Sequence, residues 1–151
     1  MNRVVGSNQQ EVEATMKIHV NRVPESGLEE HISYDSRPLD MDRFDVHLHE
    51  PFKVDAFITK VERQLVVRIQ VCCTLYCLCA RCLDEFSVVV RPQAVFSYTV
   101  DPPDVVDITE DVRQEILLTY PMIPVCQADC KGLCISCGQN WNHNSCEHRN
   151  Q

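Results

Sequence analysis

The spacing of the cysteines constrains this chain more than any other feature of its sequence. Ten of the 151 residues are cysteines. Four of them form two Cys-x-x-Cys pairs, Cys79 with Cys82 and Cys134 with Cys137. Two intervening residues allow both thiolates to reach one metal ion from a single tight turn. Gly138, after the second pair, suits such a turn, whereas Leu83, after the first, does not.

Further candidate ligands lie near the second pair. Three residues separate Cys126 from Cys130 and Cys130 from Cys134, and one residue separates Cys146 from His148. Because structural zinc takes four nitrogen or sulfur ligands, this set favours two zinc sites. The first predicted site consists of Cys79, Cys82, Cys126 and Cys130. The second predicted site consists of Cys134, Cys137, Cys146 and His148.

Other uses of the cysteines stay open on spacing alone. The two Cys-x-x-Cys pairs could instead form a single ribbon-like zinc site. The spacing from Cys130 through Cys134 to Cys137 also occurs in radical enzymes with a four-iron cluster, although this chain is short for such a scaffold. A redox dithiol is typical of a thioredoxin-like βαβ context, which the sequence does not show.

The remaining cysteines and the location of the chain have simpler interpretations. Cys72, Cys73 and Cys77 are expected to be small buried residues of a strand. Residues 1–10 lack the apolar core of a signal peptide, and no run approaches the roughly 18 apolar residues of a membrane span. We therefore expect a cytoplasmic protein without a membrane partner, in which a disulfide scaffold would not persist.

Alternating hydrophobicity predicts a mostly antiparallel β sheet, or a small barrel, with one solvated face. Strands are expected at residues 17–23, 45–49, 86–91 and 93–100, and as two strands within 52–71 that bend at residues 62–64. One helix is expected near residues 109–120, capped by Thr109 and ended by Pro121. Its apolar stripe includes Val112 and Ile116 and is expected to pack on the sheet, so the fold class is α+β.

Composition divides the chain into three parts. Residues 1–15 are polar and are predicted to be a disordered tail, after which Met16 could be a second start site. Residues 16–125 form the predicted β-rich domain. Residues 126–151 are rich in cysteine but poor in large apolar residues, so this tail needs a metal or a partner to hold a shape.

One string of residues in the C-terminal part is distinctive. It reads Cys126-x3-Cys130-Lys131-Gly132-Leu133-Cys134-x2-Cys137-Gly138-x-Asn140-x-Asn142, after Glu115-Ile116-Leu117-Leu118, Pro121 and Pro124. Together with Cys79-Ala80-Arg81-Cys82-Leu83 and Pro24-Glu25-x-Gly27, it resembles the YceD family of large-ribosomal-RNA-subunit accumulation proteins. Two positions depart from the family pattern: Trp141 replaces a usual leucine, and His148 stands where many members have a cysteine.

The resemblance implies a bacterial or plastid factor that is needed for accumulation of 23S ribosomal RNA. It implies no known catalytic activity. Because some members of that family keep only the first cysteine pair, it also implies that the first site matters to the fold and that the second is dispensable.

The sequence itself does not predict an enzyme or a small-molecule substrate. Its four glycines are scattered, and it contains no phosphate-binding loop, nucleophile elbow or HExxH motif. His47 and His49 lie on one face of a predicted strand, which a solvated surface explains as well as a metal does.

The charge distribution is compatible with two mechanisms, contact with RNA or binding of a basic ribosomal protein. The net charge of −8 excludes a uniformly basic protein that coats nucleic acid. A local basic patch could still contact RNA, with Lys60, Arg63, Arg68, Arg81 and Arg91 as its candidates. The acidic stretch from Glu25 to Glu50 instead suits an adaptor or chaperone for a basic ribosomal protein.

Overall fold

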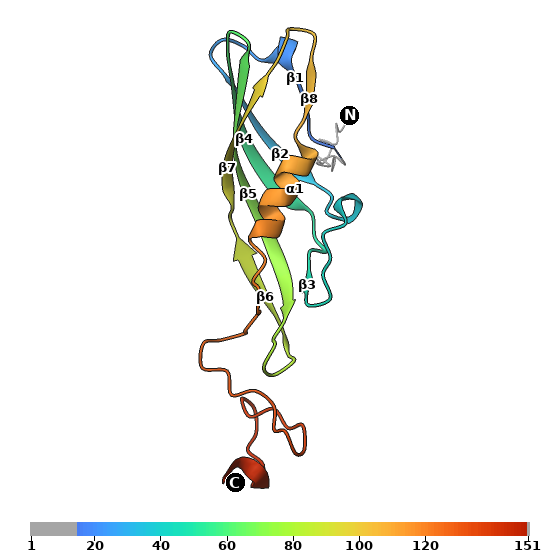
Figure 1. The fold of residues 1–151 in the computed structure, drawn as a ribbon, viewed down its shortest axis with the longest axis vertical. Helices are drawn as coiled ribbons and strands as arrows, with labels where there is room; N and C mark the ends of the chain where they lie inside the picture. The colour runs from blue at the N-terminus through green and yellow to red at the C-terminus, as the bar shows by residue number, and fades with distance from the viewer. Residues whose placement is uncertain (1–14, 151) are drawn as a thin grey trace, which may run out of the picture.

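The computed structural model describes residues 15–150, so the predicted disordered tail of residues 1–15 falls almost wholly outside the described residues. These residues form an elongated molecule, with the strands along its length and the C-terminal segment at one end (Figure 1). The strands are β1 (Lys17–His19), β2 (Leu28–Tyr34), β3 (Val46–His47), β4 (Phe52–Val61), β5 (Gln64–Leu78), β6 (Glu85–Val90), β7 (Gln93–Thr99) and β8 (Val105–Asp107). The helices are α1 (Thr109–Leu118) and the 3-10 turns η1 (Val20–Arg22), η2 (Arg37–Leu39) and η3 (Glu147–Asn150).

Strand β5 is the centre of the sheet. It pairs with β4, β3, β7 and β6, always in the antiparallel sense. Every second residue from Leu65 to Cys77 is at most 3% exposed, so one face of the strand is buried throughout. The predicted strand at residues 65–71 is confirmed, but it continues to Leu78. Cys73 and Cys77 extend the buried row as small apolar residues would.

The sheet is open. Strand β2 pairs with β4 along one edge, and β6 and β7 pair with successive halves of β5 along the other. Among the described strands these two edges do not pair with each other, so the alternative of a small barrel is not what the structure shows. Strands β1 and β8 form a separate two-stranded sheet.

Helix α1 packs on the buried face of the sheet. Val112 and Ile116 are fully buried, and Ile108 just before the helix is 3% exposed. The predicted cap at Thr109 is wrong, because its hydroxyl accepts a hydrogen bond from the backbone of Met16 at 2.8 Å. The carboxylate of Asp107 instead accepts the Thr109 N–H at 3.0 Å. This contact ties the start of the helix to β8.

Two weakly patterned segments differ from the expectation. The predicted strand at residues 17–23 ends after His19, where the chain turns into η1. The acidic stretch contains β2, which the sequence did not predict, because its exposed face carries the charged residues Glu29 and His31.

Among the described residues, no helix has the length and hydrophobicity of a transmembrane span.

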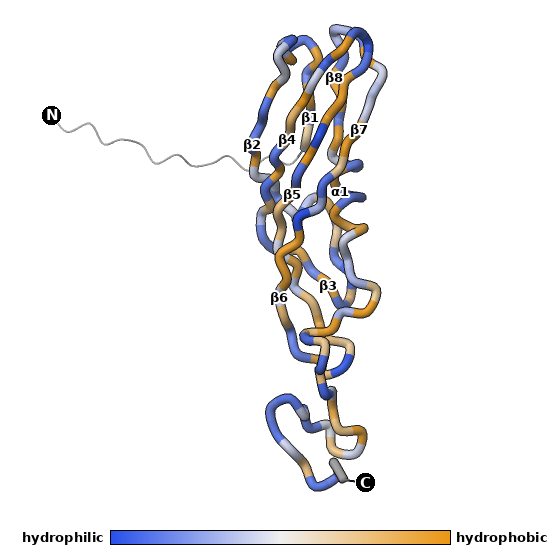
Figure 2. The backbone as a smooth tube through the Cα atoms, turned by 90° about the vertical axis from the view of Figure 1, so that its left-hand side faces the viewer, coloured by the Kyte–Doolittle hydropathy of each residue, from blue (hydrophilic) through white to orange (hydrophobic). Residues whose placement is uncertain are grey.

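The apolar core stops short of the tail. Hydrophobic colour concentrates along the strands and α1, whereas much of the C-terminal end is polar (Figure 2). The main core includes residues from Met16 to Ile116. A second, small buried cluster consists of Cys79, Cys82 and Cys130, with Phe86, Val125 and Cys126 packed against it. The tail therefore meets the domain through cysteine side chains.

Candidate metal centres

The loop between β5 and β6 presents Cys79 and Cys82. The backbone N–H of Leu83 donates to the carbonyl of Cys79, and the N–H of Cys79 donates to the carbonyl of Asp84, both at 2.9 Å. Leu83 has a φ of 61°, in the left-handed region that favours glycine. Leu83 was not expected to suit such a turn, but it adopts the left-handed conformation, and its side chain is 57% exposed.

The second Cys-x-x-Cys pair has the same turn. The N–H of Gly138 donates to the carbonyl of Cys134, and the N–H of Cys134 donates to the carbonyl of Gln139, both at 2.8 Å. Gly138 has a φ of 74°, matching the position of Leu83 in the first turn. Two segments far apart in the sequence thus present paired cysteines from equivalent backbone turns.

The first group consists of Cys79, Cys82, Cys126 and Cys130, whose sulfurs all lie within 4.8 Å of one another. The sulfurs of Cys79 and Cys130 are 3.8 Å apart, and those of Cys82 and Cys126 are 3.7 Å apart. Four thiolates about 2.3 Å from a zinc ion would be separated by about 3.8 Å, whereas a disulfide bond is about 2.05 Å long. The spacing fits a tetrahedral metal ion.

The electrostatics of the first group favour a thiolate at Cys79. Burial raises the pKa of its thiol, but donation by the backbone N–H groups of Cys126, Cys82 and Arg81 outweighs burial and lowers the pKa to about 6. The N–H of Cys126 lies 3.4 Å from this sulfur. Burial and the neighbouring sulfurs raise the pKa of Cys126 to about 12. Without a cation, the group therefore cannot hold all its sulfurs as thiolates, and a bound cation would displace the remaining protons.

The second group consists of Cys134, Cys137, Cys146 and His148, again with all ligand atoms within 4.8 Å. Cys134 is buried, whereas Cys137 and His148 are exposed. The backbone N–H groups of Cys137 and Ser136 donate to the sulfur of Cys134. These contacts outweigh burial and lower the pKa of Cys134 to about 7. The indole N–H of Trp141 donates to the sulfur of Cys146 at 3.2 Å, so this departure from the family pattern contacts a candidate ligand.

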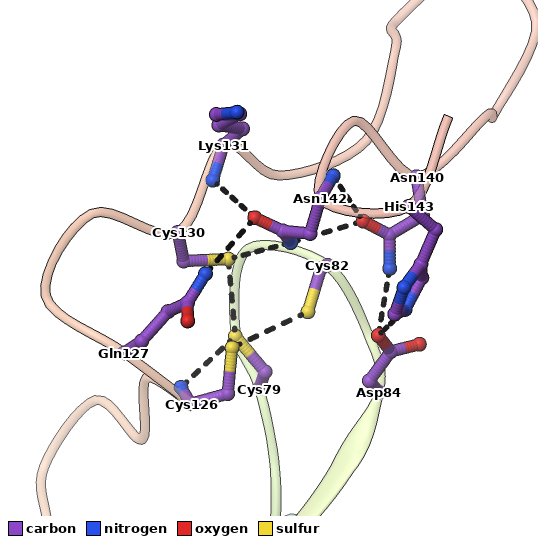
Figure 3. A network of polar contacts seen from close by, with 10 residues as sticks. All are labelled: Cys79, Cys82, Asp84, Cys126, Gln127, Cys130, Lys131, Asn140, Asn142 and His143. Atoms are coloured by element: carbon purple, nitrogen blue, oxygen red, sulfur yellow. Dashed lines mark hydrogen bonds and ion pairs between the residues drawn. The ribbon is translucent and has the colours of Figure 1, made fainter. Parts of the chain in front are cut away.

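Asparagines that the sequence analysis did not assign a role support the first group (Figure 3). The Asn142 side chain donates to the sulfur of Cys130 at 3.3 Å and accepts the N–H of Lys131 at 2.9 Å. It also donates to the side-chain oxygen of Asn140 at 2.9 Å. Asn142 therefore orients one candidate ligand and fixes the chain next to it. The spacing of the two asparagines after Gly138 was the signal that could have identified them.

Asp84 fastens the tail to the β5–β6 loop. Its carboxylate accepts the side-chain N–H of Asn140 at 2.7 Å and lies 2.9 Å from His143 Nε2 (Figure 3). The contact with His143 is the main cause that holds the pKa of Asp84 below its usual range. The backbone N–H of Leu133 also donates to the Arg81 carbonyl at 3.1 Å. These tail residues therefore all contact the loop between β5 and β6.

The structure does not bring together the cysteines of the single ribbon-like zinc site or those of the four-iron cluster. The two Cys-x-x-Cys pairs belong to different groups, so they do not form a single ribbon-like site. Cys130 lies in the first group while Cys134 and Cys137 lie in the second, so the spacing of the four-iron cluster is not gathered at one point. Cys73 and Cys77 are buried in β5, and Cys72 is half-buried.

The five candidate RNA-contacting residues are not gathered into one patch. Lys60 of β4 lies opposite Leu65 of β5, which belongs to the buried face of the sheet. Arg68 lies opposite Phe57, so the side chains of Lys60 and Arg68 are on opposite faces. Arg63 forms an ion pair with Asp101 at 2.9 Å. Arg63 and Arg81 flank the two ends of β5, whose 15 residues span about 50 Å.

Arg81 and Arg91 differ in their surroundings. The guanidinium of Arg81 donates to the backbone carbonyls of Ala128 and Cys130, at 3.4 and 3.3 Å, and so helps to hold the tail. Arg91 is exposed between β6 and β7. Arg68 and Arg91 form no ion pair among the described residues.

Comparison with known proteins covers the C-terminal part of the chain. The family described as Large ribosomal RNA subunit accumulation protein YceD matches residues 96–151. This range contains six of the eight candidate ligands, but it does not include the first cysteine pair or the early residues of the resemblance.

A curated relative matches part of the chain. The relative is the chloroplastic Large ribosomal RNA subunit accumulation protein YCED homolog 1 of Arabidopsis thaliana, 35% identical over 48 residues. The match covers 30% of this chain but only 15% of the relative. No solved structure matches the chain. The C-terminal part of the chain, residues 96–151, is therefore similar to the YceD family of large ribosomal RNA subunit accumulation proteins.

Proposed function

We propose that the two cysteine groups each bind one structural zinc ion. Seven cysteines and one histidine supply nitrogen and sulfur ligands at spacings that a tetrahedral ion requires. These soft ligands suit zinc better than they suit magnesium or calcium. The zinc ions would join the tail to the β5–β6 loop and hold its turns, in place of the apolar core that the tail lacks.

On this basis we infer that the protein is a non-catalytic ribosome biogenesis factor, needed for accumulation or processing of 23S ribosomal RNA in the large subunit. The observation that carries this proposal is the overlap between the YceD match and the segment that supplies most of the candidate ligands. A non-catalytic role is consistent with four protein ligands in each group, which would leave no position for a substrate. We propose that the protein acts in the cytoplasm, with no small-molecule substrate.

Direct contact with the 23S RNA or its precursor is the first candidate mechanism. The exposed guanidinium groups of Arg68 and Arg91 are available for phosphate contacts. Two zinc ions bound by seven thiolates would bring the formal charge to about −11. Any RNA contact must therefore be local, because the whole protein would repel RNA.

The alternative is an adaptor or chaperone for a basic large-subunit ribosomal protein. Exposed acidic side chains in the stretch from Glu25 to Glu50 favour it, including Glu29, Asp42 and Glu50. This surface would attract a basic chain more readily than RNA.

Ultraviolet cross-linking of the tagged protein in cells, followed by sequencing of the attached RNA, distinguishes the two mechanisms. RNA contact predicts a sharp peak in precursor 23S RNA that is lost on combining Arg68→Ala with Arg91→Ala. The Arg22→Ala variant, which removes an exposed arginine elsewhere, should keep the peak. Absence of RNA enrichment with co-purification of a ribosomal protein would instead favour the adaptor. Unchanged 23S RNA levels after depletion of the protein would contradict both mechanisms.

A further inference from the structure

A hollow lined by aromatic rings lies beside β3 and the C-terminal half of β5. Its lining includes Phe44, His47, His49, Tyr76 and Glu85. The rings of His47 and His49 are stacked with centroids 5.2 Å apart, and the ring of Tyr76 lies 5.8 Å from that of His49. Phe44 is 85% exposed. His49 is also exposed, whereas His47 and Tyr76 are half-buried, so the hollow offers ring surface to a ligand at its open side.

Carboxylates surround these rings. Glu50 accepts a hydrogen bond from the Tyr76 hydroxyl at 2.7 Å, and this contact raises the pKa of Tyr76. A carboxylate oxygen of Asp42 lies 3.5 Å from Nδ1 of His47. Glu85 lines the hollow and is exposed. The hollow therefore combines electron-rich ring faces with negative charge.

The arginine next to Phe44 does not neutralise this charge. Arg43 forms an ion pair with Asp45 and donates to the carbonyl of Pro121 at 2.6 Å. It is thereby held between the β3 segment and the residues that follow α1. No lysine or arginine lines the hollow among the described residues.

The charge decides which ligand the rings can take. Aromatic rings stack on nucleobases as well as on cations, but a nucleotide would bring its phosphate close to three carboxylates. A cation within about 6 Å of a ring centre is attracted both by the ring and by the carboxylates. The two histidines and these carboxylates do not form a metal-ligand group of the kind that the cysteines form.

We propose that this hollow binds an arginine or lysine side chain of a basic polypeptide segment, through the rings of Phe44, His47, His49 and Tyr76 and the carboxylates of Asp42, Glu50 and Glu85. This inference does not rest on the proposed role in RNA accumulation. A partner bound here would lie beside the β5–β6 loop that carries Cys79 and Cys82 of the first group.

The test is an NMR titration of the full zinc-bound chain with an acetylated, amidated peptide of alternating glycine and arginine. Mildly alkaline buffer keeps histidine rings ordinarily uncharged. We expect the backbone amides of Phe44, His47, His49 and Tyr76 to shift. A peptide with citrulline in place of arginine keeps the shape but removes the charge, and it should give no shift.

Matched variants locate the binding. Phe44→Ala should weaken binding of the arginine peptide about two- to fivefold, as expected for an exposed cation–π contact. Glu85→Gln should weaken it by up to about fivefold, as expected for an exposed ion pair. Met122→Ala removes another exposed apolar side chain, and Glu62→Gln removes another exposed charge; both should leave binding unchanged. Phe44 and Glu85 are exposed, so their variants should fold.

Three results would overturn the inference. Shifts confined to other acidic surfaces would show that the hollow does not take the peptide. Equal weakening by the control variants would show attraction by net charge alone. Shifts of the hollow residues with an oligouridylate, but not with the arginine peptide, would make the hollow a nucleobase platform instead.

Discussion

In both cysteine groups a Cys-x-x-Cys turn closes with the same two backbone hydrogen bonds, yet the surroundings of the two turns differ. The first turn belongs to the sheet, at the end of β5, and its cysteines are at most 2% exposed. The second turn belongs to the tail, and Cys137 is exposed. The first group joins segments some 45 residues apart, whereas the second lies within residues 134–148.

This difference separates the roles that metal would have in the two groups. Closing the first group fixes the tail and the segment after α1 against the sheet, so its loss affects a long-range connection. Closing the second group orders a local segment that has few other contacts. The same local chemistry should therefore contribute to global stability in one place and to local order in the other.

The largest expected effect is that of removing a ligand from the first group. Cys79→Ser should lose one zinc ion per chain and lower the free energy of unfolding by more than about 3 kcal/mol, because structural zinc contributes strongly to folding. Zinc analysis and thermal unfolding measure the two effects. Cys72→Ser, on the other face of β5 and outside both groups, is the control. Equal zinc content in Cys79→Ser and the wild type would contradict the assignment.

Removing a ligand from the second group should act locally. Cys137→Ser should also lose one zinc ion per chain, but the unfolding free energy of the sheet should change by no more than about 0.5 kcal/mol. Hydrogen exchange should accelerate at residues 134–148 and stay unchanged in β4 and β5. Ser136→Ala, in the same turn, should have neither effect. Loss of protection across the whole sheet would show that the two groups are not independent.

An intermediate effect is expected from the asparagine that supports the first group. Asn142→Ala removes the donor to Cys130 and leaves the N–H of Lys131 without its partner. We expect a loss of about 1–3 kcal/mol in stability and about 10- to 100-fold weaker zinc binding in a chelator competition. Asn144→Ala, whose side chain is exposed, should match the wild type. A variant that binds zinc as tightly as the wild type would show that Asn142 does not orient the ligand.

Effects of about 1 kcal/mol are expected from the residue that follows each turn. Leu83 and Gly138 share a left-handed backbone, which costs about 1–2 kcal/mol for a residue other than glycine. Leu83→Gly should relieve that cost but add freedom to the unfolded chain, so stability should rise by no more than about 1 kcal/mol. Gly138→Ala should lower local stability by about 1 kcal/mol. Urea unfolding measures the stability of Leu83→Gly, and hydrogen exchange measures the local stability of Gly138→Ala. A gain for Leu83→Gly and a loss for Gly138→Ala would support equivalent turns, whereas changes of the same sign would contradict them.

Much of the fold could be predicted where hydrophobic alternation was strong. The bend after Val61 and the buried row beginning at Leu65 followed directly from the pattern. Strand β2 could not be recognised, because it is an edge strand with several charged and polar residues, and pairing with β4 decides its structure. The cap of α1 was missed because the Thr109 hydroxyl accepts the N–H of Met16, just before β1, a tertiary contact that local sequence does not encode.

The candidate site shows a similar division. Cysteine spacing was sufficient to propose the membership of the two groups, because four ligands per zinc limit the combinations. It could not reveal Asp84, whose partners Asn140 and His143 are more than 50 residues away. Nor could it show that Arg81 contacts the tail, which depends on how the tail packs on the β5–β6 loop. That Lys60 and Arg68 lie on opposite faces depends on the pairing of β4 with β5.

Native mass spectrometry of the full chain, combined with X-ray absorption at the zinc edge, counts the metal ions and identifies their ligand atoms. We expect two zinc ions per chain, with seven sulfur ligands and one nitrogen ligand shared between them. One zinc ion per chain, or iron with bridging sulfide, would contradict the division of the cysteines into two closed zinc sites.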